Sequence, residues 1–321
     1  MLSNASIDVA FHDTYYIYII NIIYIIVICI MINKLNIKEI KNTIYKENKT
    51  ISLNNKNIDS NKDIYKHINK IYINKDINIK DYIEQFFVGL LEGCGTIIVD
   101  FISNNKKRVR IMIAVKNLQE NQQMIDILVK YIGGRKSIER NNKYVVWNAT
   151  SRTDLIKVFA ILAKYPLLTT TKQLQLDFAK DFINDNTYLS KDKFIELRNN
   201  KFIKQTNLIN YYNNNFNLPY YFPGWLSGFI EAEGHFKLIK SYNNNVHTSQ
   251  FIIGQYYDIY ILKSILSYFH SSNNTISFDK NKYYRIHLYN KNTRELIFNH
   301  FKLYPLLGYK YSQYIWWKIN H

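Results

Sequence analysis

The sequence predicts an α+β protein made of two similar domains, and two internal matches support this. FVGLLEGCG at residues 87–95 matches LSGFIEAEG at 226–234, and YPLL at 165–168 matches YPLL at 304–307. Both pairs are 139 positions apart, since 226 − 87 and 304 − 165 give the same offset. Two landmarks that share one offset indicate a duplicated unit, because chance similarity has no reason to keep a constant spacing.

Each copy is expected to begin with a helix. Apolar residues recur at helical spacing in the first copy, at Ile83, Phe87, Leu90 and Leu91. Gly95, the last residue of the motif, stands where a helix commonly ends in a left-handed residue, so we expect it to terminate the helix in that conformation.

Strands are expected after this helix. Between residues 108 and 116 basic and apolar residues occupy alternate positions. The even-numbered positions include Arg108, Arg110 and Lys116, and the odd-numbered ones include Val109, Ile111, Ile113 and Val115. This alternation predicts a strand with one basic face and one buried face. Residues 144–147 and 283–288 read as further strands, and residues 154–163 and 293–301 as helices. Trp316 and Trp317, in the last helix, are interpreted as packing residues. Each copy is therefore predicted to run helix, strands, helix, strands, helix.

The part of the chain before the repeat has a different composition. Residues 15–32 form an apolar run broken only by Asn21, close to the ~18–20 residues that span a bilayer. Residues 33–80 are rich in Asn, Lys, Ile and Asp without sustained periodicity, which is typical of a poorly ordered tether. The predicted organisation is a distinct N-terminal segment at 1–16, a hydrophobic segment and low-complexity tether at 17–80, a first domain at 81–183, a linker at 184–219 and a second domain at 220–321.

The charge balance favours a polyanionic partner. The 321 residues include 42 Lys and Arg against 25 Asp and Glu, a formal net charge of +17. Nucleic acid is the first candidate and a membrane surface the second, because neutralising phosphates releases condensed counterions. The abundance of Lys, Asn and Ile also indicates coding bias, so the placement of charge carries more weight than its amount. The two cysteines, Cys29 and Cys94, exclude a disulfide framework and a four-ligand zinc module.

The predicted opening helices carry the features that indicate chemistry. Gly89 and Gly93 are four apart, as are Gly228 and Ala232, so each helix has a face of small residues on which two backbones can approach closely. If these helices pack together, their C-terminal ends meet where Glu233 and Cys94 stand. A carboxylate, backbone carbonyls and the negative end of a helix dipole favour a hard cation. A divalent ion there would suit phosphodiester hydrolysis.

The two nine-residue motifs resemble the LAGLIDADG motifs of homing endonucleases and related group I intron maturases, and the resemblance covers nearly all of residues 81–321. It implies two αββαββα domains whose saddle-shaped antiparallel sheets lie in the DNA major groove, with the motif helices at the interdomain interface. It further implies that Glu233 binds Mg²⁺ beside the backbone of Ala232 and Gly93. The family's basic residue near the scissile phosphate is expected at Lys172 and Lys310, although these two follow YPLL at different distances.

One motif departs from the family pattern. Cys94 stands where the resemblance leads us to expect Asp or Glu, and a neutral thiol is a poor ligand for Mg²⁺. Glu92 points to a different helix face, so it and its counterpart Glu231 are interpreted as making helix-end or interface hydrogen bonds. The first half-site is thus compatible with weak cutting through a shared metal, nicking of one strand, or lost nuclease activity with retained RNA splicing. Nothing nearby suggests that Cys94 is a nucleophile.

The predicted strands supply candidate DNA contacts on their polar faces. In the first copy these are Arg108, Arg110 and Lys116; in the second they are Lys237, His247, Gln255, Lys282 and Arg285.

A second resemblance lies at the N-terminus. SNASIDVAFHDTYY at residues 3–16 resembles part of subunit 1 of cytochrome c oxidase, and the likeness stops after Tyr16. This implies a reading frame that continues from an exon (residues 1–16) into an intron, and hence a mitochondrial location. His12 is then inherited exon sequence with no role in the protein.

The sequence therefore predicts a monomeric, intron-encoded DNA endonuclease that uses Mg²⁺ to cleave double-stranded DNA at the intronless exon junction and so promotes intron homing. The alternative is an RNA maturase that assists splicing of its own group I intron. A third possibility, a membrane-anchored structural protein, rests on residues 15–32 alone.

Overall fold

A computed structural model describes residues 78–183, 187–240, 247–272, 274–279 and 282–320, without the side chains of Lys240, His247 and Thr248. The oxidase-like segment, the apolar run at 15–32 and almost all of the predicted tether lie outside these residues. No helix in the described part of the chain is both long and apolar enough to cross a membrane.

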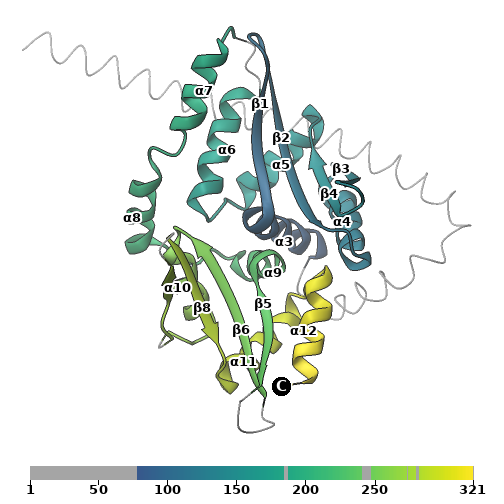
Figure 1. Cartoon of the computed structure of the whole chain (residues 1–321), viewed down its shortest axis with the longest axis vertical. Helices are drawn as coiled ribbons and strands as arrows, with labels where there is room; N and C mark the ends of the chain where they lie inside the picture. Colours follow the sequence, from purple (N-terminus) through teal and green to yellow (C-terminus); the bar gives the residue numbers. More distant parts are fainter. Residues whose placement is uncertain (1–77, 184–186, 241–246, 273, 280–281, 321) are drawn as a thin grey trace, which may run out of the picture. The chain divides into compact units, whose positions relative to one another are not determined.

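The described chain repeats one architecture twice (Figure 1). The first half comprises α3 (Ile79–Cys94), β1 (Gly95–Ser103), β2 (Lys106–Lys116), α4 (Gln119–Ile132), β3 (Arg135–Glu139), β4 (Tyr144–Ala149), α5 (Arg152–Lys164) and α6 (Thr170–Phe182). The linker contains α7 (Lys191–Asn200) and α8 (Gln205–Asn215). The second half comprises α9 (Phe222–Glu233), β5 (His235–Lys240), β6 (His247–Tyr256), α10 (Ile259–Tyr268), β7 (Ser277–Asp279), β8 (Tyr283–Leu288), α11 (Lys291–Leu303) and α12 (Tyr309–Ile319).

The α+β class and the order of helices and strands are confirmed, with one further helix closing each half. The YPLL segments separate α5 from α6 and α11 from α12. A proline disfavours helical backbone in the residue before it, so the chain leaves one helix at Tyr165 or Tyr304 and starts another a few residues later.

Each half contains a four-stranded antiparallel sheet, in the order β1-β2-β4-β3 and β5-β6-β8-β7. The alternation predicted for residues 108–116 is present in β2, where Val109, Ile111 and Ile113 are buried and Arg108 and Lys116 are exposed. One face of each sheet therefore contributes to the hydrophobic core, and the other keeps its polar side chains available.

The prediction of a left-handed residue at Gly95 is wrong. Gly95 has φ −86° and ψ 172°, an extended conformation, and it is the first residue of β1. The reason for glycine here is space: a Cβ would lie 2.5 Å from Leu91 Cδ1 and 2.6 Å from the Leu91 carbonyl oxygen. The chain passes directly from helix to strand and leaves no room for a side chain at the junction.

The two motif helices, α3 and α9, lie side by side at the centre of the described unit (Figure 1). A Cβ on Gly89 would come within 1.8 Å of the Trp225 carbonyl oxygen, and one on Gly228 within 1.9 Å of the Phe86 carbonyl oxygen. The structure thus brings the small residues to the helix contact. Large side chains around it, including Phe86 and Trp225, are fully buried.

Replacing Gly228 with Ala is expected to destabilise the protein by several kcal/mol. The added Cβ meets backbone rather than a flexible side chain, so α3 and α9 must separate to accommodate it. Within an uncrowded helix the same change would stabilise by about 1 kcal/mol, because alanine is the better helix former. Urea unfolding of the parent and the variant measures whether the free energy of unfolding falls or rises. A variant as stable as the parent would contradict the close helix contact.

Candidate functional site

The C-terminal ends of the two motif helices meet at one place. A Cβ built on Gly93 would lie 2.3 Å from the Ala232 Cβ and 3.3 Å from Glu233 Cγ, so the ends of α3 and α9 touch at these positions. The structure brings Gly93, Ala232, Glu233 and Cys94 to this junction. Both helices end here, so the negative ends of their dipoles coincide.

Glu233 is the carboxylate at this junction. It is partly buried, and no hydrogen bond or ion pair joins its carboxylate to another described residue. Burial raises the pKa of Glu233, while the positive charges of Lys310 and Lys172 lower it. A shielded carboxylate with two cations near it and no direct partner is arranged to receive a ligand.

The two lysines lie in the first turns of the helices that close each half. Lys172 is the third residue of α6, and its Nζ donates a hydrogen bond to the Gly95 carbonyl oxygen at 2.5 Å. Lys310 is the second residue of α12, and its backbone N–H donates to Glu231 Oε1 at 3.0 Å. Burial lowers the pKa of both lysines, and nearby carboxylates, Glu233 among them, oppose this. The lysines thus face the junction from equivalent helices, one residue out of register.

The oxygen donors at the junction fit a hard divalent cation, and Cys94 does not. The Glu233 carboxylate and the carbonyls of the helix ends are oxygen ligands of the kind that Mg²⁺ and Ca²⁺ prefer. Burial raises the pKa of Cys94 to about 12, and its thiol donates to the Leu90 carbonyl oxygen at 3.4 Å. Cys94 is therefore a neutral thiol. Among the described residues no three His, Cys, Asp or Glu side chains gather to hold a metal, so carbonyls would have to complete the set.

Glu92 and Glu231 have a structural role, which confirms their interpretation as hydrogen-bonding residues. Glu92 accepts hydrogen bonds from the backbone N–H groups of Leu168 and Thr169 and from Trp225 Nε1. Glu231 accepts from backbone N–H groups at the start of α12 in the same way, at 3.0–3.2 Å. Burial raises the pKa of Glu92 to about 7. These carboxylates fix the helices that carry Lys172 and Lys310 to the motif helices.

A second pair of side chains ties each closing helix to the opposite half. Asp258, beside α10, accepts from the Thr170 N–H at 3.0 Å and from the Thr170 hydroxyl at 2.6 Å. In the corresponding place Asn121 of α4 accepts from the Tyr309 N–H at 2.9 Å. The lysine of each half is thus positioned by residues of both halves. The two equivalent positions differ chemically, because Asp258 is a carboxyl group and Asn121 is a neutral amide.

Asp258→Asn is expected to reduce the pH dependence of stability. Burial raises the pKa of Asp258 from 3.8 to about 6. Because the folded state holds this proton more tightly than the unfolded state, stability falls as pH rises from about 4 to about 6. The introduced asparagine cannot titrate, so the variant should lose less stability over this pH range than the parent. The difference should be up to about 3 kcal/mol, which corresponds to a pKa shift of about two. Urea unfolding between pH 4 and 7.5 measures it.

The converse change is the control for this experiment. Asn121→Asp introduces a carboxyl at the equivalent place, near the Lys116 carbonyl oxygen that Asn121 Nδ2 now contacts at 2.9 Å. The new carboxyl group should therefore make stability fall further as pH rises, in the same direction as Asp258 does. Parallel stability curves for the parent and Asp258→Asn would show that Asp258 keeps an ordinary pKa.

The open face of the first sheet carries the predicted basic residues. Arg110 makes two hydrogen bonds to Asp100 of β1, at 2.6 and 3.0 Å, and Arg108 contacts the same carboxylate at 3.2 Å. Lys116 is exposed and close enough to Lys310 for their charges to interact. Arg135 of β3 pairs with Asn148 and shares this face. Sequence reasoning missed Arg135 because β3 is short and polar, without a recognisable alternation.

The second sheet presents a matching set. Lys237 of β5 and Arg285 of β8 are exposed on the open face, and Lys282 lies in the turn before β8 with φ 58°. His235 and His287 also lie on this face, at even spacing from Lys237 and Arg285, and sequence reasoning missed both. Burial lowers the pKa of both imidazoles, so they are neutral near pH 7 and can accept or donate hydrogen bonds. His247 belongs to β6, and its side chain lies outside the described structure.

Gln255 requires a correction. It lies two and four residues after Ile253 and Phe251 in β6, so it shares the helix-covered face on which those two are buried, and its side chain hydrogen-bonds Asp258. Gln255 therefore lies on the opposite face from Lys237 and Arg285 and is removed from the set of candidate DNA contacts. From the sequence alone Gln255 is a polar strand residue, and only the strand register shows which face of the sheet it occupies.

The sequence and fold of this chain are similar to those of known proteins. The family described as LAGLIDADG endonuclease matches residues 87–183 and 226–321. A relative from Debaryomyces hansenii, described as a probable intron-encoded endonuclease aI3, is 30% identical over 339 residues, covering 97% of this chain and 46% of the relative. The chain thus spans about half the length of that relative.

Two solved structures share the fold. The LAGLIDADG homing endonuclease I-GzeII in complex with its DNA target has a TM-score of 0.59 at 19% identity, over 74% of this chain and 88% of that chain. I-SmaMI bound to uncleaved DNA in the presence of calcium ions has a TM-score of 0.56 at 20% identity, over 74% and 89%. With both halves matched and the motif helices paired at the centre, the chain belongs to the LAGLIDADG endonuclease family.

Proposed function

We propose that this protein is a site-specific DNA endonuclease that hydrolyses phosphodiester bonds with Mg²⁺ and mediates homing of a mitochondrial group I intron. The observation that carries the proposal is the Glu233 carboxylate, partly buried and unpaired among described residues at the junction of the two motif helices. Lys172 and Lys310 face it, and a polar sheet face extends on either side. The membership of the family and the intron-encoded description of the relative support it.

Each group at the junction has a distinct part in such a reaction. Glu233 and the carbonyls of Ala232 and Gly93 would hold the cation, which when bound activates water and stabilises the leaving oxygen. Lys172 and Lys310 would place positive charge beside the phosphate, where negative charge increases in the transition state. Their partial burial strengthens this effect, because charges interact more strongly away from bulk water.

The two open sheet faces would position the target. Arg108, Arg110 and Lys116 on one side and Lys237 and Arg285 on the other can contact phosphates and base edges in the grooves. Because both motif helices come from one chain, a monomer supplies both half-sites. The two halves differ in sequence, so the target need not be a palindrome.

Supercoiled plasmid carrying the joined exons tests this function. The protein is incubated with the plasmid with and without Mg²⁺. Linear product that requires Mg²⁺ supports a double-strand endonuclease, and open circles alone indicate that one half-site works. A protein that binds the plasmid but leaves it supercoiled would contradict the proposed activity.

The second candidate is an RNA maturase, favoured by one observation. Cys94 is a neutral thiol where the family resemblance leads us to expect an acidic ligand, so the first motif lacks a metal-binding group that cleavage would use and that RNA binding would not need. The test is splicing of the host intron in cells that lack the protein. Normal splicing there would exclude this function.

A further inference from the structure

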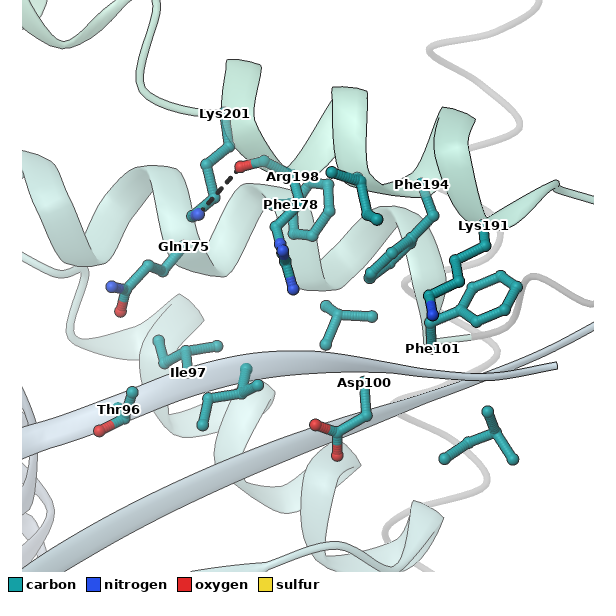
Figure 2. Close-up of a pocket in the computed structure, with 14 residues that line it drawn as sticks. Thr96, Ile97, Asp100, Phe101, Gln175, Phe178, Lys191, Phe194, Arg198 and Lys201 are labelled. Carbon is teal, nitrogen blue, oxygen red and sulfur yellow. Dashed lines mark hydrogen bonds between the residues drawn. The ribbon is translucent and has the colours of Figure 1, made fainter. Parts of the chain in front are cut away.

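A groove of about 670 Å³ runs along the outer edge of the first sheet, between β1 and the helices α6 and α7 (Figure 2). We call it the linker groove. Its polar lining consists of Thr96 and Asp100 from β1, Gln175 from α6, and Lys191, Arg198 and Lys201 from the linker. The two halves differ here, because along β5 the described chain has α12, the counterpart of α6, and no counterpart of α7.

The linker is fixed against the sheet by polar contacts at one end of α7 and aromatic packing along it. The Leu189 N–H donates to the Asn104 carbonyl oxygen at 2.8 Å, and Lys107 Nζ donates to the Thr187 carbonyl oxygen at 2.6 Å. Phe194 is buried, with its ring centre 5.5 Å from that of Phe101. These contacts hold α7 at the strand edge, and with it the basic side chains of Lys191 and Arg198.

The groove is strongly positive. No described carboxylate pairs with Lys191, Arg198 or Lys201. Asp100 is the only acidic group among the described lining residues, and two arginines already neutralise it. Burial lowers the pKa of Lys201, and the neighbouring charge of Arg198 lowers it further, so an anion bound here would relieve repulsion between the two.

Gln175 adds a second indication of a ligand. Its Oε1 atom is buried and has no hydrogen-bond partner among the described residues. Buried polar atoms normally have a partner, and because an amide oxygen accepts hydrogen bonds, a water molecule or another donor in the groove would complete this one. The three basic side chains that line the groove are donors well suited to phosphate oxygens, which accept hydrogen bonds.

We propose that the linker groove binds the phosphate backbone of duplex DNA along the outer edge of the first half-site. This inference rests on the proposed DNA-binding function and extends it to residues outside the sheets. The groove is continuous with the open face of the first sheet, because Asp100 lines it and also contacts Arg108 and Arg110 on that face. A duplex lying on that face would therefore bring a phosphate strand past α7.

The test compares two triple variants of the full chain. One removes the groove cations, as Lys191→Ala, Arg198→Ala and Lys201→Ala. The matched control removes three exposed cations elsewhere, as Arg152→Ala, Lys157→Ala and Lys193→Ala. Lys193 lies on the same helix and pairs with Glu196 at 2.9 Å, outside the groove. Thermal unfolding first establishes that both variants fold.

Binding to a mixed-sequence DNA duplex is then measured by fluorescence anisotropy over a series of salt concentrations, with Ca²⁺ in place of Mg²⁺. Each phosphate contact makes the slope of log K against log salt more negative by about 0.9. The slope of the groove variant should therefore be about 3 less steep than that of the parent. Its affinity at low salt should fall about 10- to 100-fold, and the control should change far less.

Equal slopes for the groove variant and the control would overturn the proposal. So would unchanged duplex binding combined with weaker binding to the folded intron RNA, which would assign the groove to RNA. Failure of the proposed nuclease function gives a different result: wild-type protein binds the duplex with a steep salt dependence that the groove variant loses, yet it does not cleave the exon-junction plasmid.

Discussion

Glu233→Gln should slow cleavage by about 10³-fold while leaving the fold and DNA affinity close to those of the parent. Glutamine has almost the same size but no charge, so its amide oxygen is a much weaker ligand for a divalent cation than the carboxylate it replaces. A bound metal contributes several kcal/mol to phosphodiester hydrolysis; a loss of about 4 kcal/mol corresponds to about a 10³-fold slower rate. Timed conversion of supercoiled plasmid in Mg²⁺ measures the rate.

The structure predicts that this variant folds. The Glu233 carboxylate makes no hydrogen bond to another described residue, and burial already raises its pKa, so a neutral amide removes a desolvation cost. Glu231→Gln is the contrasting variant, because Glu231 caps α12 through three backbone hydrogen bonds and its loss should lower stability. A Glu233→Gln protein that cleaves at the parent rate would remove Glu233 from the proposed metal site.

Cys94→Glu should accelerate cleavage of the slower DNA strand by about 10- to 100-fold, or convert a nicking activity into double-strand cleavage. The substitution places a carboxylate opposite Glu233 and replaces a neutral thiol with the hard oxygen ligand that Mg²⁺ prefers. Separate rates for the appearance of open-circular and linear plasmid distinguish the first cut from the second. Cys94→Ser is the control, since it keeps the size and remains uncharged.

A measurement without DNA gives a second test of this variant. Two carboxylates at one junction repel each other, so Cys94→Glu should be less stable than the parent without metal. Ca²⁺ should then raise its melting temperature by more than it raises that of the parent, because a ligand that binds only the folded state stabilises it. Identical shifts in the two proteins would show that residue 94 does not contribute to cation binding.

The sequence by itself determined the duplicated architecture and the positions of the motif helices. The 139-residue offset, the small residues at Gly89 and Gly228, and the alternation in β2 are local or repeated patterns, and periodicity reports them directly. It also identified Cys94 as the departure and interpreted Glu92 and Glu231 as hydrogen-bonding residues, since these inferences need only residue chemistry and position within a motif.

Only the tertiary structure decided which side chains meet across long sequence separations. Asp100 pairs with two predicted DNA contacts, Gln255 turns away from the open face toward Asp258, and Gly95 has no room for a side chain beside Leu91. The linker groove also depends on where α7 packs. A sequence pattern reports which face of its own strand or helix a residue occupies, but burial, ion pairing and pKa depend on neighbours that only the folded chain brings together.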